Sequence, residues 1–543
     1  MQPYQILDLP IDDVGCEGEG IAHYEGYTVF VPFAAPGERV RARITTVNAR
    51  KNIAFARVES VIEPSPDRVK PPCKYFGVCG GCDYMHLDYA AELKYKHLAL
   101  RRTLSKAGID TEIDDIVPSD NEFGYRNKAQ PVFSEKDGKI VLGFYKERTR
   151  TVKPIDHCIL HPDWLKDIIS EVTDWANEFK LSAYSYDTHK GLLRHLAVRE
   201  LGGVMQVTVV ATSEHIPGIK ELQDRLLKLY PNLSFGISVN TSTGAKIFGD
   251  KYVYLRESGP IEIDGITFPL HPYSFFQIND NVRKKVYSTL VELLKPGKDL
   301  IFIDLYAGIG LTGIPFAKAG GDVVNVEIIP EATADSEKLY RENGLSAECV
   351  TMDAAKALPE LIKRFKDSEK RLTIYLDPPR KGVSHEVVER LNALAAERDF
   401  TLAYLSCNPA TLARDIAALT AFTAVSPIRP FDMFPKTANL ETVVLLSKLN
   451  TKQHIEVELN LDELDLTAAE SKATYEEIKE YVLEHTGLKV SHLYIAQVKQ
   501  KYGIIERENY NKPKSESSRQ LKCPPEKEAA IAEALKHFGM ISE

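Results

Sequence analysis

Residues 300–310 read LIFIDLYAGIG, an apolar run that ends in an acid and then in a glycine-rich turn. The run lacks polar alternation, which is typical of a strand buried on both faces of a sheet. Helical patterns separate it from further apolar runs at residues 323–327, 347–350, 373–376, 401–405 and 442–446. This alternation predicts a parallel, doubly wound α/β sheet between about residue 270 and residue 449.

The turn after the first strand is suited to a nucleoside ligand. Gly308 and Gly310 lie in this turn, and Glu327 ends the second strand. Glycines let a ligand approach the backbone, and an acid at the end of the second strand can accept both ribose hydroxyls. A dinucleotide fits imperfectly, because the next glycine, Gly313, is three residues after Gly310 and not two. Without a phosphate to bind, the same geometry suits an adenosine ligand such as S-adenosylmethionine.

Residues 406–409 read SCNP and lie between the strand at 401–405 and a helical pattern. The turn should present Cys407 at the carboxyl edge of the sheet, where open α/β folds bind their ligands. A thiol there can attack an electron-poor carbon and leave again. A lone cysteine is more often a buried core residue, but the acids Asp377 and Glu441 end or begin neighbouring strands and favour a catalytic role.

A cysteine cluster precedes the sheet. Residues 73–82 space Cys73, Cys79 and Cys82 as C-x5-C-x2-C, and Cys158 is a candidate fourth ligand. Zinc ribbons prefer two separate C-x2-C pairs, whereas a three-plus-one arrangement suits a cubane iron–sulfur cluster. An iron–sulfur cluster, a zinc ion and a loop without metal remain the alternatives at this point.

Length and composition predict a multidomain protein of the cytoplasm. The 543 residues exceed what one hydrophobic core supports. A hydrophobic content of 44% is that of a globular protein. The N-terminus lacks the features of a signal peptide, and no window reaches the length of a membrane span.

Charge is distributed unevenly along the chain. The formal net charge is −9, which does not favour a nucleic-acid partner, because phosphates bind Lys and Arg. Residues 124–153 nevertheless hold eight Lys or Arg against three acids, and residues 451–470 are acidic. Residues 1–60 predict a small β-barrel, whose cations form either a solvated face or an RNA-binding face: Arg39, Arg41, Arg43, Arg50, Lys51 and Arg57.

Five motifs, taken in this order, resemble those of the RNA 5-methyluridine methyltransferase family: FFQIN at 275–279, DLYAGIG at 304–310, DPPR at 377–380, SCNP at 406–409 and NLET at 439–442. The N-terminal segment resembles a TRAM domain. The cysteine loop is similar to the iron–sulfur loop of the ribosomal-RNA branch. The resemblance covers residues 1–449, and Ala307 replaces a cysteine that is frequent in the family's glycine turn.

The resemblance implies an α/β multidomain architecture. We expect a TRAM-like RNA-binding barrel at residues 1–60 and an α+β central domain with the iron–sulfur loop at 61–270. A Rossmann-like, S-adenosylmethionine-dependent methyltransferase domain should follow at 271–449. Residues 450–543 carry no catalytic pattern and should be mostly helical.

The resemblance also implies the chemistry. Cys407 adds to C6 of uracil, Glu441 removes the C5 proton and Asp377 orients the base or the thiol. The implied S-adenosyl-L-methionine contacts are Gln277, Tyr306, Gly308, Gly310, Glu327, Asp353 and Asp377. The implied ligands of a [4Fe–4S] cluster are Cys73, Cys79, Cys82 and Cys158. The target uridine should be single-stranded or flipped out of its stack.

The resemblance favours methylation of 23S ribosomal RNA by a monomer that binds neither DNA nor a membrane. Methylation of transfer RNA is the first alternative. A Rossmann oxidoreductase with an iron–sulfur centre is another, but it leaves the Cys407 and Glu441 pair unexplained. A non-catalytic RNA-binding protein is the third, and the intact Cys407, Glu441 and Gln277 disfavour it.

Overall fold

The computed structural model describes residues 1–147, 149–448, 475–486, 488, 490, 492–502 and 524–538. The chain divides into two compact units, Met1–Asn450 and Thr451–Glu543. No helix within those described ranges is long and apolar enough to cross a membrane. The predicted acidic stretch at 451–470 lies outside the described residues.

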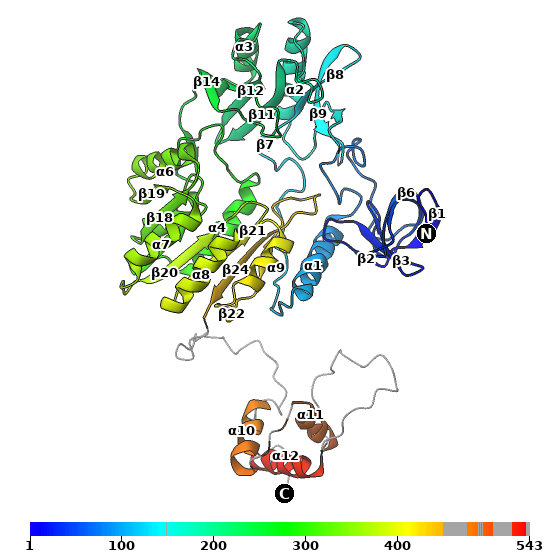
Figure 1. The fold of residues 1–543 in the computed structure, drawn as a ribbon, viewed down its shortest axis with the longest axis vertical. Helices are drawn as coiled ribbons and strands as arrows, with labels where there is room; N and C mark the ends of the chain where they lie inside the picture. Colours follow the sequence, from blue (N-terminus) through cyan, green and yellow to red (C-terminus); the bar gives the residue numbers. More distant parts are fainter. Residues whose placement is uncertain are drawn as a thin grey trace. The chain divides into compact units, whose positions relative to one another are not determined.

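The N-terminal strands form one curled sheet around an apolar core (Figure 1). The strands are β1 (Ile6–Pro10), β2 (Asp13–Val14), β3 (Gly20–Tyr24), β4 (Tyr27–Val31), β5 (Arg39–Asn48) and β6 (Ile53–Glu63). Their order is β1-β5-β6-β4-β3-β2. Strand β5 alternates between buried and exposed residues, as expected for a strand with one face on a core.

Three arginines on the exposed face of β5 have acidic partners. Arg41 pairs with Asp8 at 2.8 Å and Arg43 with Glu59 at 2.6 Å. Arg39 lies 3.8 Å from the carboxylate of Glu63. Exposed ion pairs contribute little to stability, but they reduce the charge that this face offers to a phosphate.

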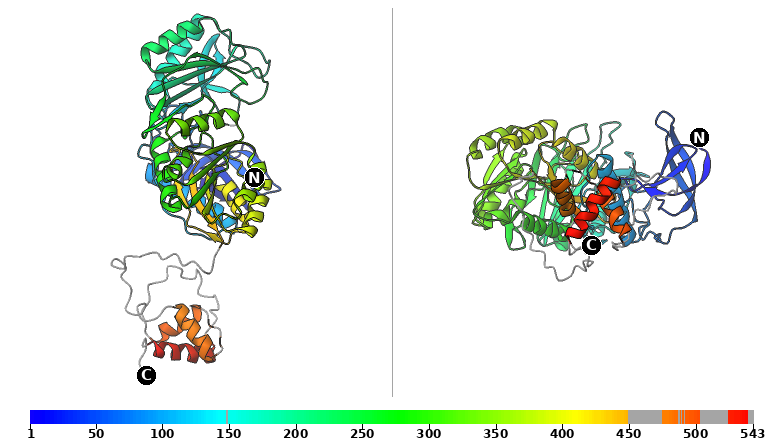
Figure 2. Two further views of the ribbon diagram at one scale, coloured as in Figure 1. Left: turned by 90° about the vertical axis from the view of Figure 1, so that its left-hand side faces the viewer. Right: turned by 90° about the horizontal axis from the view of Figure 1, so that it is seen from below.

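The central part of the chain forms a second sheet. Its strands are β7 (Lys128–Ala129), β8 (Val132–Lys136), β9 (Lys139–Tyr145), β10 (Val152–Pro154), β11 (Leu193–Leu201), β12 (Val204–Ala211), β13 (Leu233–Val239) and β14 (Lys251–Arg256). The order is β10-β9-β8-β11-β12-β13-β14, and β7 pairs with β11. Helices α2 (Trp164–Glu178) and α3 (Ile219–Leu229) pack on this sheet around Trp175 and Leu222 (Figure 2). A short hairpin, β15 (Ile261–Ile263) with β16 (Ile266–Phe268), leads to the next domain.

The third sheet has the Rossmann-like arrangement that the sequence predicts. Its strands are β17 (Leu300–Asp304), β18 (Asp322–Glu327), β19 (Glu348–Thr351), β20 (Arg371–Leu376), β21 (Thr401–Ser406), β22 (Ala424–Val425), β23 (Arg429–Phe431) and β24 (Glu441–Ser447). The order is β19-β18-β17-β20-β21-β24-β22, with β23 paired to β24. The order reverses at β17, and such a switch point is where open α/β sheets bind ligands.

One sequence prediction about this sheet is wrong. Strands β17 to β21 are parallel, but β24 runs antiparallel to β21. A parallel neighbour requires a crossover connection, usually a helix. Between α9 and β24 the chain instead forms only the short strands β22 and β23, so it returns in the opposite direction.

Helices cover both faces of the sheet. One face carries α1 (Tyr89–Lys106), α7 (Ala354–Phe365), α8 (His385–Glu397) and α9 (Pro409–Ala418). The other carries α4 (Asp280–Leu294), η1 (Leu311–Gly313), α5 (Ile314–Lys318) and α6 (Pro330–Glu342). Helix α1 comes from far earlier in the chain and lies beside α9 (Figure 1).

The described part of the second unit contains three helices. They are α10 (Tyr475–Thr486), α11 (His492–Lys501) and α12 (Pro525–His537). Their apolar side chains share a small core that includes Ile478, Ile495 and Ile531. This unit therefore has a hydrophobic core of its own.

Candidate active site

The register of two strands brings the predicted nucleophile and base together. Ser406 at the end of β21 pairs with Thr442 near the start of β24, and the Thr442 hydroxyl donates to the Ser406 carbonyl at 3.1 Å. Cys407 follows Ser406, and Glu441 precedes Thr442. In an antiparallel pair these two residues are therefore direct neighbours at one sheet edge.

The local sequence explains the turn that carries Cys407. Asn408 is the N-cap of α9, and its side-chain oxygen accepts from the Ala410 N–H at 3.0 Å. Pro409 occupies the first helical position, where its missing N–H costs nothing. The thiol thus lies at a helix N-terminus, where the positive end of the helix dipole favours a thiolate.

Two carboxyl groups surround the thiol in a buried, acidic site. Burial, followed by the charges of Glu441 and Asp377, raises the pKa of Cys407 to about 12. Burial raises the pKa of Asp377 to about 7. Burial and the Asp377 carboxylate raise the pKa of Glu441 well above its ordinary value. The site therefore favours protons and positively charged ligands.

The base candidate has an unused acceptor. Glu441 is 3% exposed, and its Oε2 has no hydrogen-bond partner among the described residues. A buried carboxylate oxygen without a partner is costly unless a ligand or proton completes it. This oxygen is free to take a proton from a ligand held beside Cys407.

Arg380 connects three of the motifs, a role that sequence reasoning missed. Its guanidinium donates to Asn439 Oδ1 at 2.6 Å, and its carbonyl accepts from Asn408 Nδ2 at 3.4 Å. Its charge lowers the pKa of both Cys407 and Glu441 against the larger effect of burial. Its place directly after Asp377-Pro378-Pro379 was the available signal.

The glycine turn and Glu327 form the second half of the site. The Gly308 N–H donates to Glu327 Oε2 at 2.9 Å, and the Ile329 N–H donates to Oε1 at 2.9 Å. A carboxylate has about four acceptor positions, so two bonds leave capacity for ribose hydroxyls. Ile328 is 61% exposed directly beside this acid, an apolar surface that suits the face of a nucleobase.

Of the other predicted cofactor contacts, Tyr306 follows β17, Asp353 follows β19 at the same end of the sheet, and Gln277 precedes α4. Asp353 caps α7 by accepting from the Ala355 N–H at 3.0 Å. Burial, then the charges of Asp353 and Asp415, raise the pKa of Tyr306 to about 12. Gln277 is 8% exposed, and its backbone carbonyl accepts from Asn127 at 2.8 Å.

The same motif contains Asn279, which sequence reasoning quoted without a role. Asn279 caps α4 by accepting from the Val282 N–H, and its amide donates to Met433 O at 3.4 Å. Met433 belongs to the segment that leads to Glu441. The Asn279 amide therefore helps to hold that segment on the domain.

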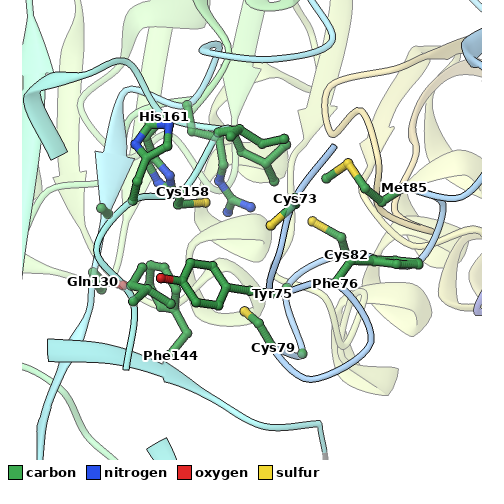
Figure 3. Close-up of a pocket in the computed structure, with 18 of the residues that line it drawn as sticks. Cys73, Tyr75, Phe76, Cys79, Cys82, Met85, Gln130, Phe144, Cys158 and His161 are labelled. Carbon is green, nitrogen blue, oxygen red and sulfur yellow. The ribbon is translucent and has the colours of Figure 1, made fainter. Parts of the chain in front are cut away.

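The four cysteines line one cavity away from Cys407. The cavity has a volume of about 590 Å³, and Figure 3 shows the sulfur atoms of Cys73, Cys79, Cys82 and Cys158 around it. Burial and the nearby thiols raise the pKa of Cys82 well above its ordinary value. Phe275 and Ile278, which flank Gln277, line the same cavity.

The cysteine cavity does not hold an assembled metal-ligand set. Among the described residues, no group of three His, Cys, Asp or Glu side chains is arranged to hold a metal ion. The cavity wall nevertheless includes Arg126, whose buried Nε has no partner among those residues. An unpaired guanidinium N–H beside four thiols fits an anionic group, as a cluster held by four thiolates is.

Two protein families match this chain. Residues 218–449 match the family described as tRNA (uracil-5-)-methyltransferase, and residues 2–58 match the TRAM domain. The first match contains β17 to β24 and every residue of the acidic site. The second covers most of the N-terminal sheet.

Curated relatives and a solved structure agree with these matches. An uncharacterized RNA methyltransferase of Halalkalibacterium halodurans is 33% identical over 454 residues, which is 82% of this chain and 97% of the relative. One from Caldanaerobacter subterraneus is 34% identical over 451 residues, 81% of this chain and 98% of the relative. The Pyrococcus abyssi tRNA (uracil-54, C5)-methyltransferase, solved with S-adenosyl-L-homocysteine, is 27% identical, with a TM-score of 0.64 over 81% of this chain and 99% of that one.

Proposed function

This chain belongs to the RNA (uracil-5-)-methyltransferase family, and from that premise we propose that it methylates C5 of a uridine in 23S ribosomal RNA. Because the chain belongs to this family, we no longer interpret the glycine turn and the cysteine loop as parts of a Rossmann oxidoreductase. The observation that carries the proposed mechanism is the pairing of Ser406 with Thr442, which sets Cys407 beside Glu441.

Cys407 and Glu441 have complementary tasks. The Cys407 thiolate adds to C6 of uracil, and the electron pair of the C5–C6 double bond makes C5 nucleophilic. S-adenosylmethionine would supply an electrophilic methyl carbon on a positively charged sulfur, a charge that the acidic site favours. C5 takes this methyl group as the S–CH3 bond breaks, and S-adenosylhomocysteine is the leaving group. Glu441 Oε2 then takes the C5 proton, the double bond re-forms, the C6–S bond breaks and Cys407 leaves as a thiolate.

The residues of the second half of the site would hold the methyl donor. Glu327 offers its remaining acceptor positions to the ribose hydroxyls, and Gly308 and Gly310 keep the turn open to the ligand. Gln277, Tyr306, Asp353 and Asp377 complete the proposed set. Asp377 borders both halves, because its charge acts on Cys407 and on Asp304 at the end of β17.

We propose that Cys73, Cys79, Cys82 and Cys158 hold one [4Fe–4S] cluster, and that Arg126 offsets its negative charge. Methyl transfer needs no electron, so the proposed role of the cluster is structural. Iron and sulfide analysis of protein purified without oxygen tests this. Stoichiometric zinc without iron would contradict it.

The choice of 23S ribosomal RNA is supported by the similarity of the cysteine loop to that of the ribosomal-RNA branch. Transfer RNA is the second candidate, because the similar Pyrococcus abyssi enzyme is named for uridine 54 of tRNA. Mass mapping of 5-methyluridine in both RNAs, from cells with and without this protein, separates the two.

The roles of Cys407 and Glu441 are separable by substitution. Cys407→Ala should bind RNA and form no methylated product, because C5 is never activated. Glu441→Gln should allow addition and methylation and then stall before elimination, with turnover reduced roughly a hundred- to ten-thousand-fold. The measurement is a denaturing gel with methyl-labelled donor, on which a covalent RNA–protein adduct accumulates in Glu441→Gln.

The double variant of Cys407 and Glu441 is the control for this experiment. The double variant Cys407→Ala, Glu441→Gln should form no adduct. An adduct that persists in it would identify another nucleophile. A Glu441→Gln protein that binds RNA normally but forms no adduct would remove Glu441 from the proposed role.

A further inference from the structure

Glu441 is reached through a segment without regular structure. Residues 432–440, here called the approach segment, connect the end of β23 at Phe431 to β24, which begins at Glu441. The segment is nevertheless deeply buried at Asp432, Lys436 and Leu440. The segment contains no helix or strand. Its backbone conformation must therefore be stabilised by contacts with other parts of the protein.

The cysteine loop supplies hydrogen bonds to the second half of this segment. Asp83 directly follows Cys82. Its N–H donates to the Lys436 carbonyl at 2.9 Å, and its carboxylate Oδ2 accepts from the Ala438 N–H at 2.8 Å. The Tyr84 N–H donates to the same Lys436 carbonyl at 3.1 Å. Asp83 thus binds the approach segment at Lys436 and at Ala438. Ala438 lies three residues before Glu441.

Lys436, whose carbonyl accepts these hydrogen bonds, has an unfavourable backbone conformation. Lys436 has φ of 69°, in the left-handed region that L-residues with a side chain seldom adopt. Such a conformation persists only where its surroundings determine it fully. Release of the Lys436 carbonyl and the Ala438 N–H would therefore let the segment relax toward an ordinary backbone.

Helix α1 holds the side chain of the same residue. The Lys436 N–H donates to Glu92 Oε1 at 2.6 Å, and its Nζ lies 3.1 Å from Glu92 Oε2 and 2.6 Å from a Glu122 oxygen. Lys96 bonds both Glu92 and Asp432, at 2.8 and 2.7 Å. These buried ion pairs anchor the segment at Asp432 and Lys436. Beyond Lys436, Asp83 bonds Ala438 and Arg380 bonds Asn439, while Leu440 packs in the hydrophobic core.

We propose that Asp83 is a positioning residue for Glu441 and that it couples the cysteine loop to the elimination step. The inference rests on the proposed function, because it takes Glu441 as the base. The loop fixes Asp83, Asp83 fixes Lys436 and Ala438, and these set where the Glu441 carboxylate lies. Addition and methylation depend on Cys407, which lies in the turn after β21 and outside the approach segment, so they should survive loss of this link.

The test compares three changes at one position in the full-length, iron-loaded protein. Asp83→Ala removes the acceptor for the Ala438 N–H, and it should lower kcat at least tenfold, leave the KM for RNA within threefold and accumulate the methylated covalent adduct. Asp83→Asn keeps a side-chain oxygen in place and should restore turnover to within threefold. Asp83→Glu keeps the charge but moves it one methylene outward, and should behave like Asp83→Ala.

Asp156→Ala is the matched control. Asp156 binds Lys74 and Tyr75 of the same cysteine loop, at 2.6 and 2.7 Å, but has no contact with the approach segment. It should leave kcat within twofold and accumulate no adduct. Iron content is measured for every variant, so that loss of the cluster is recorded separately from loss of the link.

The outcomes distinguish the inference from the function on which it rests. Adduct in Asp83→Ala and Asp83→Glu, but not in Asp83→Asn or Asp156→Ala, supports the coupling. If Asp83→Ala does not fold, Asp83→Glu decides the question. Adduct in Glu441→Gln with none in either Asp83 variant overturns the coupling alone, whereas its absence from Glu441→Gln refutes the proposed function.

Discussion

The thiol of Cys407, the proposed nucleophile, lies in surroundings that oppose its charged form. Cys407 is close to two carboxyl groups, and burial with their charges holds its pKa at about 12. The helix N-terminus and Arg380 act in the opposite direction. A thiol so protected reacts slowly with adventitious electrophiles. We expect a positively charged ligand in this acidic site to lower the pKa of the Cys407 thiol and so to activate it as a nucleophile.

Asp377 should make the protein's stability depend on pH. Its folded pKa of about 7 lies above its ordinary value of 3.8, so between these values the unfolded chain releases a proton that the folded protein keeps. Its contribution is therefore greatest near pH 4 and is lost as pH rises to about 7, by up to about 1.4 kcal/mol per pH unit.

Asp377→Asn removes that titration and isolates the effect. The free energy of unfolding of the variant, relative to the parent, should rise between pH 4 and 7 and then level off. Urea unfolding at pH 4, 5, 6, 7 and 8 measures it. A difference that stays constant across this range would show that Asp377 ionises normally in the folded protein.

At the level of elements, the sequence predicted the strands of the Rossmann-like sheet well. The ends of five predicted apolar segments agree within one or two residues with those of β17, β18, β19, β20 and β21. A continuous apolar segment of this length is typical of a strand buried on both faces of a sheet. The direction of β24 was missed. Direction depends on the connection before the strand, and the short strands β22 and β23 give little signal of their own.

The positions of four candidate site residues in the fold were predictable, because these residues end, follow or begin strands. Cys407, Asp377, Glu327 and Glu441 each adjoin a strand whose place follows from its apolar pattern. The hydrogen bond between the Ala438 N–H and Asp83 could not be predicted from the sequence, because the two residues are 355 positions apart. Nothing local in either segment specifies such a contact, which arises only when the cysteine loop meets the methyltransferase domain.

The glycine turn after β17 offers a matched pair of substitutions. Both glycines have positive φ, 53° at Gly308 and 79° at Gly310. A Cβ at Gly308 would meet nothing within 4 Å, whereas one at Gly310 would lie 2.5 Å from Ser336 Oγ and 2.6 Å from Asn325 Nδ2.

Gly310→Ala should therefore be the more damaging change. Gly308→Ala adds only backbone strain, about 1–2 kcal/mol, while Gly310→Ala adds overpacking of about 1–3 kcal/mol. Thermal unfolding of the two variants measures the difference in stability. Equal losses would mean that strain alone decides, and that the contacts of Gly310 with Asn325 and Ser336 yield without cost.

At the scale of the whole molecule, the chain consists of two units with different relations to the family. The family match ends at residue 449, and the first compact unit ends at Asn450. Every residue of the acidic site and all four cysteines of the loop lie in that first unit. The described helices of the second unit have an apolar core of their own.

Removal of residues 451–543 should therefore leave a folded and active enzyme. The truncated protein should unfold at the same temperature as the first unit of the full chain, because its cores are intact. Methyl transfer to a short RNA stem-loop should stay within about threefold, a change of roughly 0.7 kcal/mol in the barrier. S-adenosylmethionine binding by calorimetry and methyl transfer by mass spectrometry measure the two properties. Cys407→Ala in the truncated protein is the control and should abolish product. A truncated protein that folds but no longer binds the methyl donor would show that the second unit completes the site, and the division of function drawn at residue 450 would then be wrong.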